Sequence, residues 1–263
     1  MIAEKVHENA QLVYQMVRLR TYPFGIKLIE DESEIPAEAL RPLRDLGYHL
    51  DLCQAFNMSR VQGKTMAMLK EDMWCFEPVV GFGLAEPREE FLEGENRFSA
   101  SIMSKEAARN WARSTLPRLQ TERYKGVLSA PLNNCSFQPD LFVIYCDPEQ
   151  LTQLLIAQNA IDGRDLDSSL AGHAACVYTV VPVIQKKRPV VAVPCRGDRR
   201  NAMAQSDEII FAGPTEGLAD LAEALRYLDG HGWSYPWYFE LHPERKLTDN
   251  YAKLGRLMGM DLK

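Results

Sequence analysis

The sequence lacks an excess of positive charge, a membrane-length hydrophobic run and a recognisable secretion signal. Its 30 basic residues are outnumbered by 36 acidic ones, and a net charge of −6 disfavours binding to nucleic acid through phosphate contacts. The longest apolar runs, 141–146 and 174–184, fall short of the roughly 18 residues that span a bilayer. The first residues carry charges but no continuous apolar segment. We therefore expect a cytoplasmic protein with no nucleic-acid or membrane partner.

Local motifs of common nucleotide-binding and hydrolytic sites are also missing. Gly63-Lys64-Thr65 matches the end of a phosphate-binding loop, but Met58 stands where the first glycine is required. Gly81-Phe82-Gly83 is followed by Glu86 where a dinucleotide fingerprint needs a small residue. No G-x-S-x-G, H-E-x-x-H or C-x-x-C occurs. The sequence therefore gives no local signature of these classes.

The chain is long enough to fold around a sizeable core. With 263 residues, of which 46% are hydrophobic, it is expected to bury about 70–75% of its extended-chain surface. We predict a single domain over 1–263, either undivided or formed by lobes of about 1–120 and 121–230, with an aromatic-rich tail at 231–263. Such a chain needs no disulfides, and cytoplasmic thiols stay reduced, so the six cysteines need another explanation.

Hydrophobic periodicity and turn residues predict alternating helices and strands. Helices are expected over 4–19, 46–61, 104–119, 149–161 and 215–228, and strands over 24–29, 65–69, 126–132, 141–146, 190–193 and 209–212. Segment 168–187 is predicted to be helical, although its β-branched residues favour a strand and Pro182 favours a helix end. Two strand pairs without an intervening helix favour an α+β fold, a two-layer mixed sheet with helices packed on it.

The segment Pro194–Arg200 follows a predicted strand directly and combines a thiol, a carboxylate and three guanidinium groups. One interpretation is an anion or cofactor site formed by Arg196, Arg199, Arg200 and Lys27. Another is a catalytic Cys195, whose pKa nearby arginines would lower toward a reactive thiolate. The structural alternative is a tight turn at Gly197 in which Asp198 pairs with an arginine and caps local amides.

Four of the cysteines form a candidate metal site. The predicted ligands are Cys53, Cys75, Cys176 and Cys195, with His49 and His173 as alternates. His49 stands four residues before Cys53 and His173 three before Cys176, so each pair would share a face if its segment were helical. Thiolate and imidazole ligands suit zinc or an iron–sulfur cluster. The alternative for any one of these cysteines is packing in the core as a small hydrophobic residue.

Several of these segments together resemble a known family. They are Arg20, 22–27, Cys53-Gln54, Arg60, Gly63, Cys75, Pro139-Asp140, 148–150, Cys176, 194–199, Asp207-Glu208 and Pro214. In this order they are similar to the bacterial and archaeal "domain of unknown function 169" family, over about residues 12–228. The resemblance implies a cytoplasmic single-domain protein, common in anaerobes, with no assigned reaction.

Three functions follow from these observations. The first is a small-anion or cofactor-binding protein with a cysteine- and arginine-rich site, which either binds an anion without chemistry or holds a thiolate-ligated metal or an iron–sulfur centre. The second is an enzyme that uses Cys195 as a nucleophile, with His49 or His173 as its base. The third is a protein that binds partners or a second copy of itself through the aromatic segment 232–239, although that segment can equally wrap over its own core.

Overall fold

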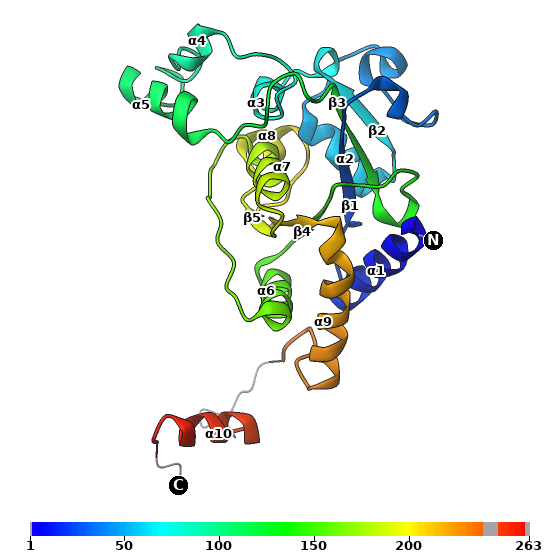
Figure 1. Ribbon diagram of the computed structural model, residues 1–263, viewed down its shortest axis with the longest axis vertical. Coiled ribbons are helices and arrows are strands. Elements are labelled where there is room, and N and C mark those ends of the chain that lie inside the picture. The colour runs from blue at the N-terminus through cyan, green and yellow to red at the C-terminus, as the bar shows by residue number, and fades with distance from the viewer. Residues whose placement is uncertain (1, 239–246, 261–263) are drawn as a thin grey trace.

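The computed structural model describes residues 2–238 and 247–260, and the side chains within it from residue 4 onward. Its helices are α1 (Ile2–Met16), α2 (Leu52–Gln62), α3 (Phe76–Gly81), α4 (Glu89–Leu92), α5 (Lys105–Asn110), α6 (Pro148–Asp162), α7 (Ala175–Lys186), α8 (Arg196–Asn201), α9 (Leu218–Gly230) and α10 (Asp249–Leu257) (Figure 1). Its strands are β1 (Phe24–Ile29), β2 (Met66–Leu69), β3 (Gly126–Pro131), β4 (Leu141–Cys146), β5 (Val190–Ala192) and β6 (Ile209–Pro214).

The six strands form one open sheet in the order β2-β3-β1-β4-β6-β5. Each neighbouring pair is antiparallel, with Phe24 of β1 opposite Pro131 of β3 on one side and Val143 of β4 on the other. The predicted α+β class is confirmed, and the sheet is antiparallel throughout rather than mixed. The two strands from the first 120 residues, β1 and β2, lie on either side of β3 from the later part of the chain, and sequence periodicity carries no information on the direction in which such distant strands pair.

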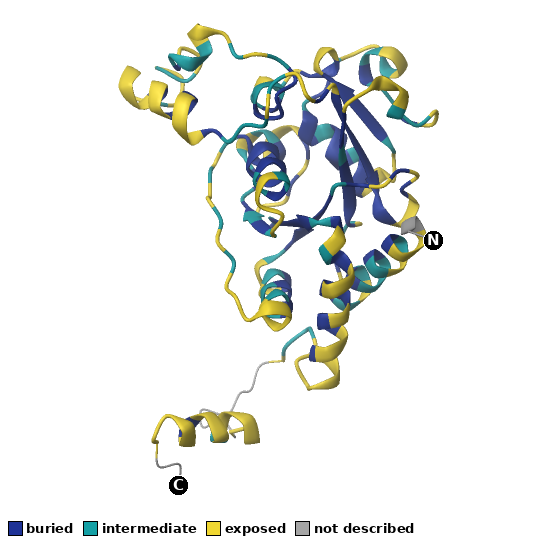
Figure 2. Ribbon diagram, in the orientation of Figure 1, coloured by how far each residue is buried: buried dark blue, intermediate teal, exposed yellow. Residues whose placement is uncertain are grey.

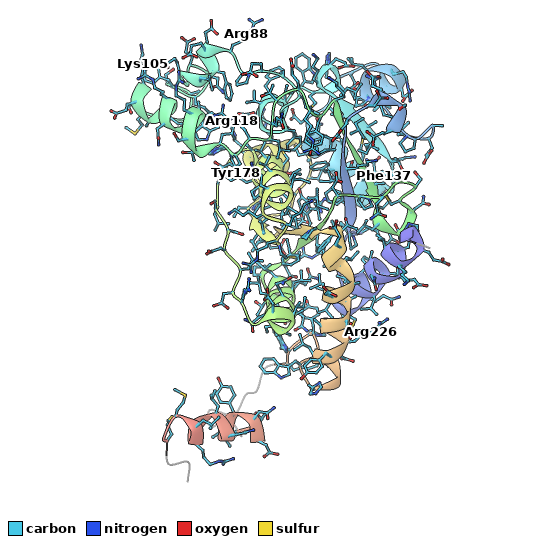
Figure 3. All side chains as sticks on the ribbon, viewed as in Figure 1. Arg88, Lys105, Arg118, Phe137, Tyr178 and Arg226 are labelled. Carbon is cyan, nitrogen blue, oxygen red and sulfur yellow. The ribbon has the colours of Figure 1, made fainter. Side chains whose placement is uncertain are left out.

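Helices cover both faces of the sheet. Because side chains alternate along a strand, Phe24, Ile26 and Val143 point to the face on which α2 and α7 pack. Phe142 and Phe211 point to the opposite face, where they contact the packed helices α1, α6 and α9. Buried residues accordingly concentrate in the strands and on the inner faces of these helices (Figure 2), and side chains fill the space between the layers (Figure 3).

The ambiguous segment 168–187 contains a helix, as predicted. Helix α7 begins only at Ala175 and includes Pro182. Eight of its residues, from Ala175 to Val183, are buried, so packing against the sheet outweighs the local strand preference and the bond that Pro182 cannot donate. The predicted helix over 104–119 is shorter, because α5 passes into a wider π-helical turn, Trp111–Thr115. This late start of α7 and this turn both shape the site described below.

The aromatic C-terminal segment lies beyond α9. Gln153 of α6 donates a hydrogen bond to the carbonyl of Trp233, which ties the start of the segment to the body. Tyr238 is exposed, Phe239 lies outside the described residues, and α10 stands apart from the other helices in Figure 1. Among the described helices, none has both the length and the apolar character required to cross a bilayer.

Candidate functional site

Four of the six cysteines lie at the starts of four separate helices. Cys75 and Cys195 are the capping residues of α3 and α8, while Cys53 and Cys176 are the second residues of α2 and α7. Contacts of α2 with α8 and of α3 with α7 place these starts on the same side of the sheet. The cysteines are far apart in sequence, and they meet because the four helices begin near one point.

These four cysteines, the four-thiol site, interact with one another. In every pairing of the four, the charge of one thiolate raises the pKa of the other thiol. A Cβ atom built on Gly197 would lie 3.5 Å from the Sγ of Cys195 and 3.9 Å from that of Cys53, so these two sulfurs flank one small space. The backbone N–H of Ala175, at the start of α7, donates to the Sγ of Cys195. Among residues 2–238 and 247–260, no three cysteine, histidine or acidic side chains are placed to hold a single metal ion.

The other two cysteines lie in different parts of the core. Cys146 packs among α1, α6 and α9 on the opposite face of the sheet. Cys135 packs beside Phe137, and its thiol donates to the carbonyl of Phe137 at 3.1 Å. Neither cysteine belongs to the predicted ligand set, and both lie in core clusters other than the one that contains residues of the Cys53-bearing helix α2 and of helix α7.

Burial raises the pKa of all four thiols in the site. At Cys195 the Asp198 carboxylate raises the pKa further, since its Oδ2 lies 3.3 Å from the sulfur. The expectation that nearby arginines lower the pKa of Cys195 is therefore wrong, because the charged group that contacts the thiol is negative. This environment favours the neutral thiol over a nucleophilic thiolate.

Neither histidine forms the predicted helical pair with a cysteine, because both precede the helix in question. His49 lies before α2, and its ring packs against Trp74 in a tilted arrangement with centroids 4.5 Å apart. His173 lies before α7, and its Nε2 accepts a 2.5 Å hydrogen bond from the indole N–H of Trp111. Since an indole N–H only donates, a neutral His173 carries its proton on Nδ1. Burial lowers the pKa of His173, which favours this neutral form.

The predicted cations do not converge on one anion. Arg199 donates from its guanidinium to the carbonyls of Gln205 and Glu208, and the exposed Arg200 follows it on α8. Lys27 forms a 2.6 Å ion pair with Glu34. Its neighbours along β1 point to the face of the sheet on which α2 and α7 pack, and Lys27 points to the opposite face. Of the predicted set, Arg196 alone lines the cavity described next.

A cavity of about 590 Å³ opens beside the four-thiol site. Its lining includes Cys75, Cys195, Arg97, Arg196, Trp111 and His173. Arg97 lies 4.7 Å from the centre of the Trp111 ring, and its Nη2 forms a 2.7 Å ion pair with Glu77. The size is in the usual range for small-molecule sites, and two cysteines of the four-thiol site form part of its wall.

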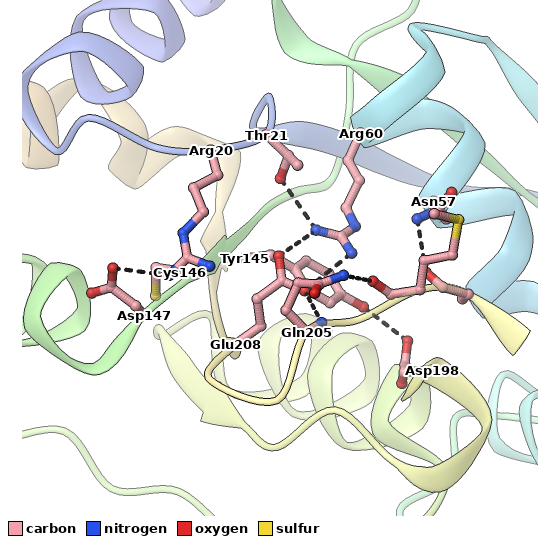
Figure 4. Close-up of polar contacts among 12 residues, drawn as sticks. Arg20, Thr21, Asn57, Arg60, Tyr145, Cys146, Asp147, Asp198, Gln205 and Glu208 are labelled. Atoms are coloured by element: carbon pink, nitrogen blue, oxygen red, sulfur yellow. Dashed lines mark hydrogen bonds and ion pairs between the residues drawn. The ribbon is translucent and has the colours of Figure 1, made fainter. Parts of the chain in front are cut away.

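A buried polar network holds α8 against the sheet (Figure 4). The hydroxyl of Tyr145 donates to Oδ1 of Asp198 at 2.9 Å, while Oδ2 accepts from the backbone N–H of Cys195 at 3.2 Å. Arg60 lies 4.0 Å from the centre of the Tyr145 ring and forms a buried ion pair with Glu208 at 2.7 Å. Asp198 thus caps α8 as expected, but its second oxygen accepts from a tyrosine rather than from an arginine. This network fixes the backbone position of Cys195.

The substitution Tyr145→Phe is expected to lower the free energy of unfolding by about 1–3 kcal/mol, because it leaves Oδ1 of buried Asp198 without its donor. Urea denaturation of the two proteins would measure the difference. Tyr48→Phe is the matched control, since Tyr48 is more than half exposed, and we expect a change within about 0.5 kcal/mol. Equal stability of Tyr145→Phe and the wild type would contradict the structural role of this hydroxyl.

Sequence reasoning missed most of the cavity wall, including Glu77, Arg97 and Trp111. Arg97 ends a charged segment that reads as an exposed loop, yet its side chain is only 17% exposed. Trp111 sits at the turn where α5 widens, and that turn has no evident sequence signal. The sequence offered one indication, the residue types themselves, because arginine and tryptophan are common components of binding sites.

Comparison with known proteins gives a family but no activity. The sequence profile of the DUF169 family, described as "Uncharacterised ArCR", matches residues 13–224. The chain is also similar to the uncharacterised protein MJ0308 of Methanocaldococcus jannaschii, with 25% identity over 229 residues that cover 86% of this chain and 96% of that protein. No solved structure matches.

Proposed function

This chain belongs to the uncharacterised DUF169 family, and we propose that it is a cofactor-binding protein whose four-thiol site holds an iron–sulfur cluster beside a pocket for a small anion. The observation that carries the proposal is that Cys53, Cys75, Cys176 and Cys195 stand at the starts of four helices on one side of the sheet. The Sγ atoms of Cys53 and Cys195 flank one small space at Gly197. Four cysteine thiolates are the usual ligand set of such clusters.

The surroundings of the thiols suit a bound anionic group. Helices α2 and α7 have 11 and 12 residues, and the positive ends of both helix dipoles lie at Cys53 and Cys176. A further backbone N–H, that of Ala175, already donates to the Sγ of Cys195. Hydrogen bonds from backbone amides to cysteine sulfurs are among the features that tune the potential of an iron–sulfur centre.

The size of the core disfavours a structural zinc ion. Structural zinc commonly compensates for a small core, whereas this chain has a core on both faces of its sheet. An iron–sulfur cluster supplies one-electron transfer when bound.

The chain's own residues would protect and orient such a centre. Cys53 and Cys176 are buried, so their side of the site is closed to water. Cys75 and Cys195 line the cavity, so their side is the one a small molecule reaches. The Tyr145–Asp198 hydrogen bond and the cap on the Cys195 amide hold the latter ligand in place. The site thus has one enclosed side and one accessible side.

Anaerobic reconstitution of the full chain with ferrous iron and sulfide tests the proposal. We expect a coloured protein with about four iron and four sulfide ions per chain and visible charge-transfer absorption that reduction bleaches. Parallel incubation with zinc is the control for non-specific thiol binding. A protein that stays colourless with iron and sulfide, or that takes up one zinc ion and excludes iron, would overturn the proposal.

A further inference from the structure

The cavity beside the four-thiol site carries a small excess of positive charge. Arg97 is neutralised by its 2.7 Å ion pair with Glu77, and burial together with the hydrogen bond that Nε2 accepts from Trp111 favours the neutral form of His173. Arg196 lines the cavity from the first position of α8, is exposed, and has no ion pair with any described residue. The cavity therefore offers one unpaired guanidinium, which suits a ligand with a single negative charge.

The remaining wall is largely aromatic and aliphatic. Trp111 and Ile102 line the cavity, and the Trp111 N–H is already used by His173. The indole therefore presents carbon atoms to a ligand, while Nδ1 of His173 keeps a free proton to donate. A cavity of about 590 Å³ accommodates a small organic molecule rather than a bare ion.

We propose that this cavity binds a small organic monocarboxylate. Arg196 pairs with the carboxylate in the bidentate manner that a planar guanidinium allows, His173 Nδ1 donates a further hydrogen bond, and the apolar part of the ligand packs on Trp111 and Ile102. A phosphate dianion is a poorer fit, because the second cation of the cavity, Arg97, is already paired with Glu77. The ligand lies beside Cys75 and Cys195.

The carboxylate would occupy the cavity of the same site as the proposed cofactor, so the placement of this ligand next to a cluster rests on the proposed function. The carboxylate contacts themselves involve no metal. Binding is therefore measurable both on the metal-free chain and on the reconstituted protein.

Isothermal titration with benzoate and hexanoate tests the inference, with benzamide as the neutral analogue of benzoate and inorganic phosphate as the competing anion. We expect binding of at least one carboxylate and of neither benzamide nor phosphate. Arg196→Ala should weaken carboxylate binding by about ten- to a hundredfold, because it removes a charge-assisted pair. Arg200→Ala, on the same helix but outside the cavity wall, should bind as the wild type does.

The inference is overturned if neither carboxylate binds, if phosphate alone binds, or if Arg196→Ala retains wild-type affinity. Iron and sulfide content, measured on the same samples, distinguishes failure of the carboxylate proposal from failure of the iron–sulfur proposal. A protein that loads a cluster but binds no carboxylate contradicts the ligand class alone. One that binds a carboxylate through Arg196 but loads no cluster contradicts the metal centre alone.

Discussion

Serine in place of any one cysteine of the four-thiol site is expected to reduce iron–sulfur loading by about a hundredfold or more. A serine hydroxyl is a harder ligand than a thiolate and stays protonated at neutral pH. Loss of a group that hydrogen-bonds to a metal ligand commonly lowers the affinity for the metal by about 10–100-fold. Loss of the ligand itself should lower that affinity at least as much. The four variants are Cys53→Ser, Cys75→Ser, Cys176→Ser and Cys195→Ser. Iron, sulfide and visible absorption after anaerobic reconstitution measure the effect.

The matched controls are Cys135→Ser and Cys146→Ser, which change buried cysteines away from the site. Both should load iron and sulfide as the wild type does. Circular dichroism and the melting temperature establish that each variant is folded before its metal content is compared. Full loading of all four site variants would refute the proposed centre, and so would loss of loading in the folded controls to the same extent.

Gly197→Ala is expected to leave the metal-free fold intact and to prevent loading of the cluster. The new Cβ would lie 3.5 Å from the Sγ of Cys195 and 3.9 Å from that of Cys53, which are ordinary contact distances. Gly197 is inside α8 and does not adopt a positive φ, so alanine should be neutral or stabilise the helix by about 0.5–1 kcal/mol. The methyl group would nevertheless occupy space between two sulfurs that a bound centre requires.

Gly172→Ala is the matched control, because Gly172 lines the same cavity and a Cβ there would meet no atom within 4 Å. We expect normal iron and sulfide loading in this variant and a strong loss in Gly197→Ala, with melting temperatures of both metal-free proteins close to the wild type. Normal loading of Gly197→Ala would mean that the centre does not use the space between Cys53 and Cys195. An unfolded Gly197→Ala would instead contradict the packing at this position.

Part of the candidate site could be predicted from the chain. The distinction between four cysteines and the other two follows from the family-like pattern; the structure places the four at helix starts and the other two elsewhere in the core. The failure of Lys27 and Arg199 to join an anion site follows from tertiary contacts with Glu34 and with the 205–208 turn. The pKa of Cys195 was predicted in the wrong direction because sequence proximity to arginines says nothing of burial or of the contacting carboxylate.

The sequence by itself determined the α+β class, the family and most helices and strands, because these depend on local periodicity, residue type and the order of the motifs along the chain. The tertiary structure alone decided the antiparallel strand order, the gathering of four helix starts and the enclosure of Arg97 and Trp111 around a cavity. These features depend on pairings between segments remote in the chain, and no local pattern fixes the distances between them. Position along the sequence identified the candidate ligands, and packing placed them together.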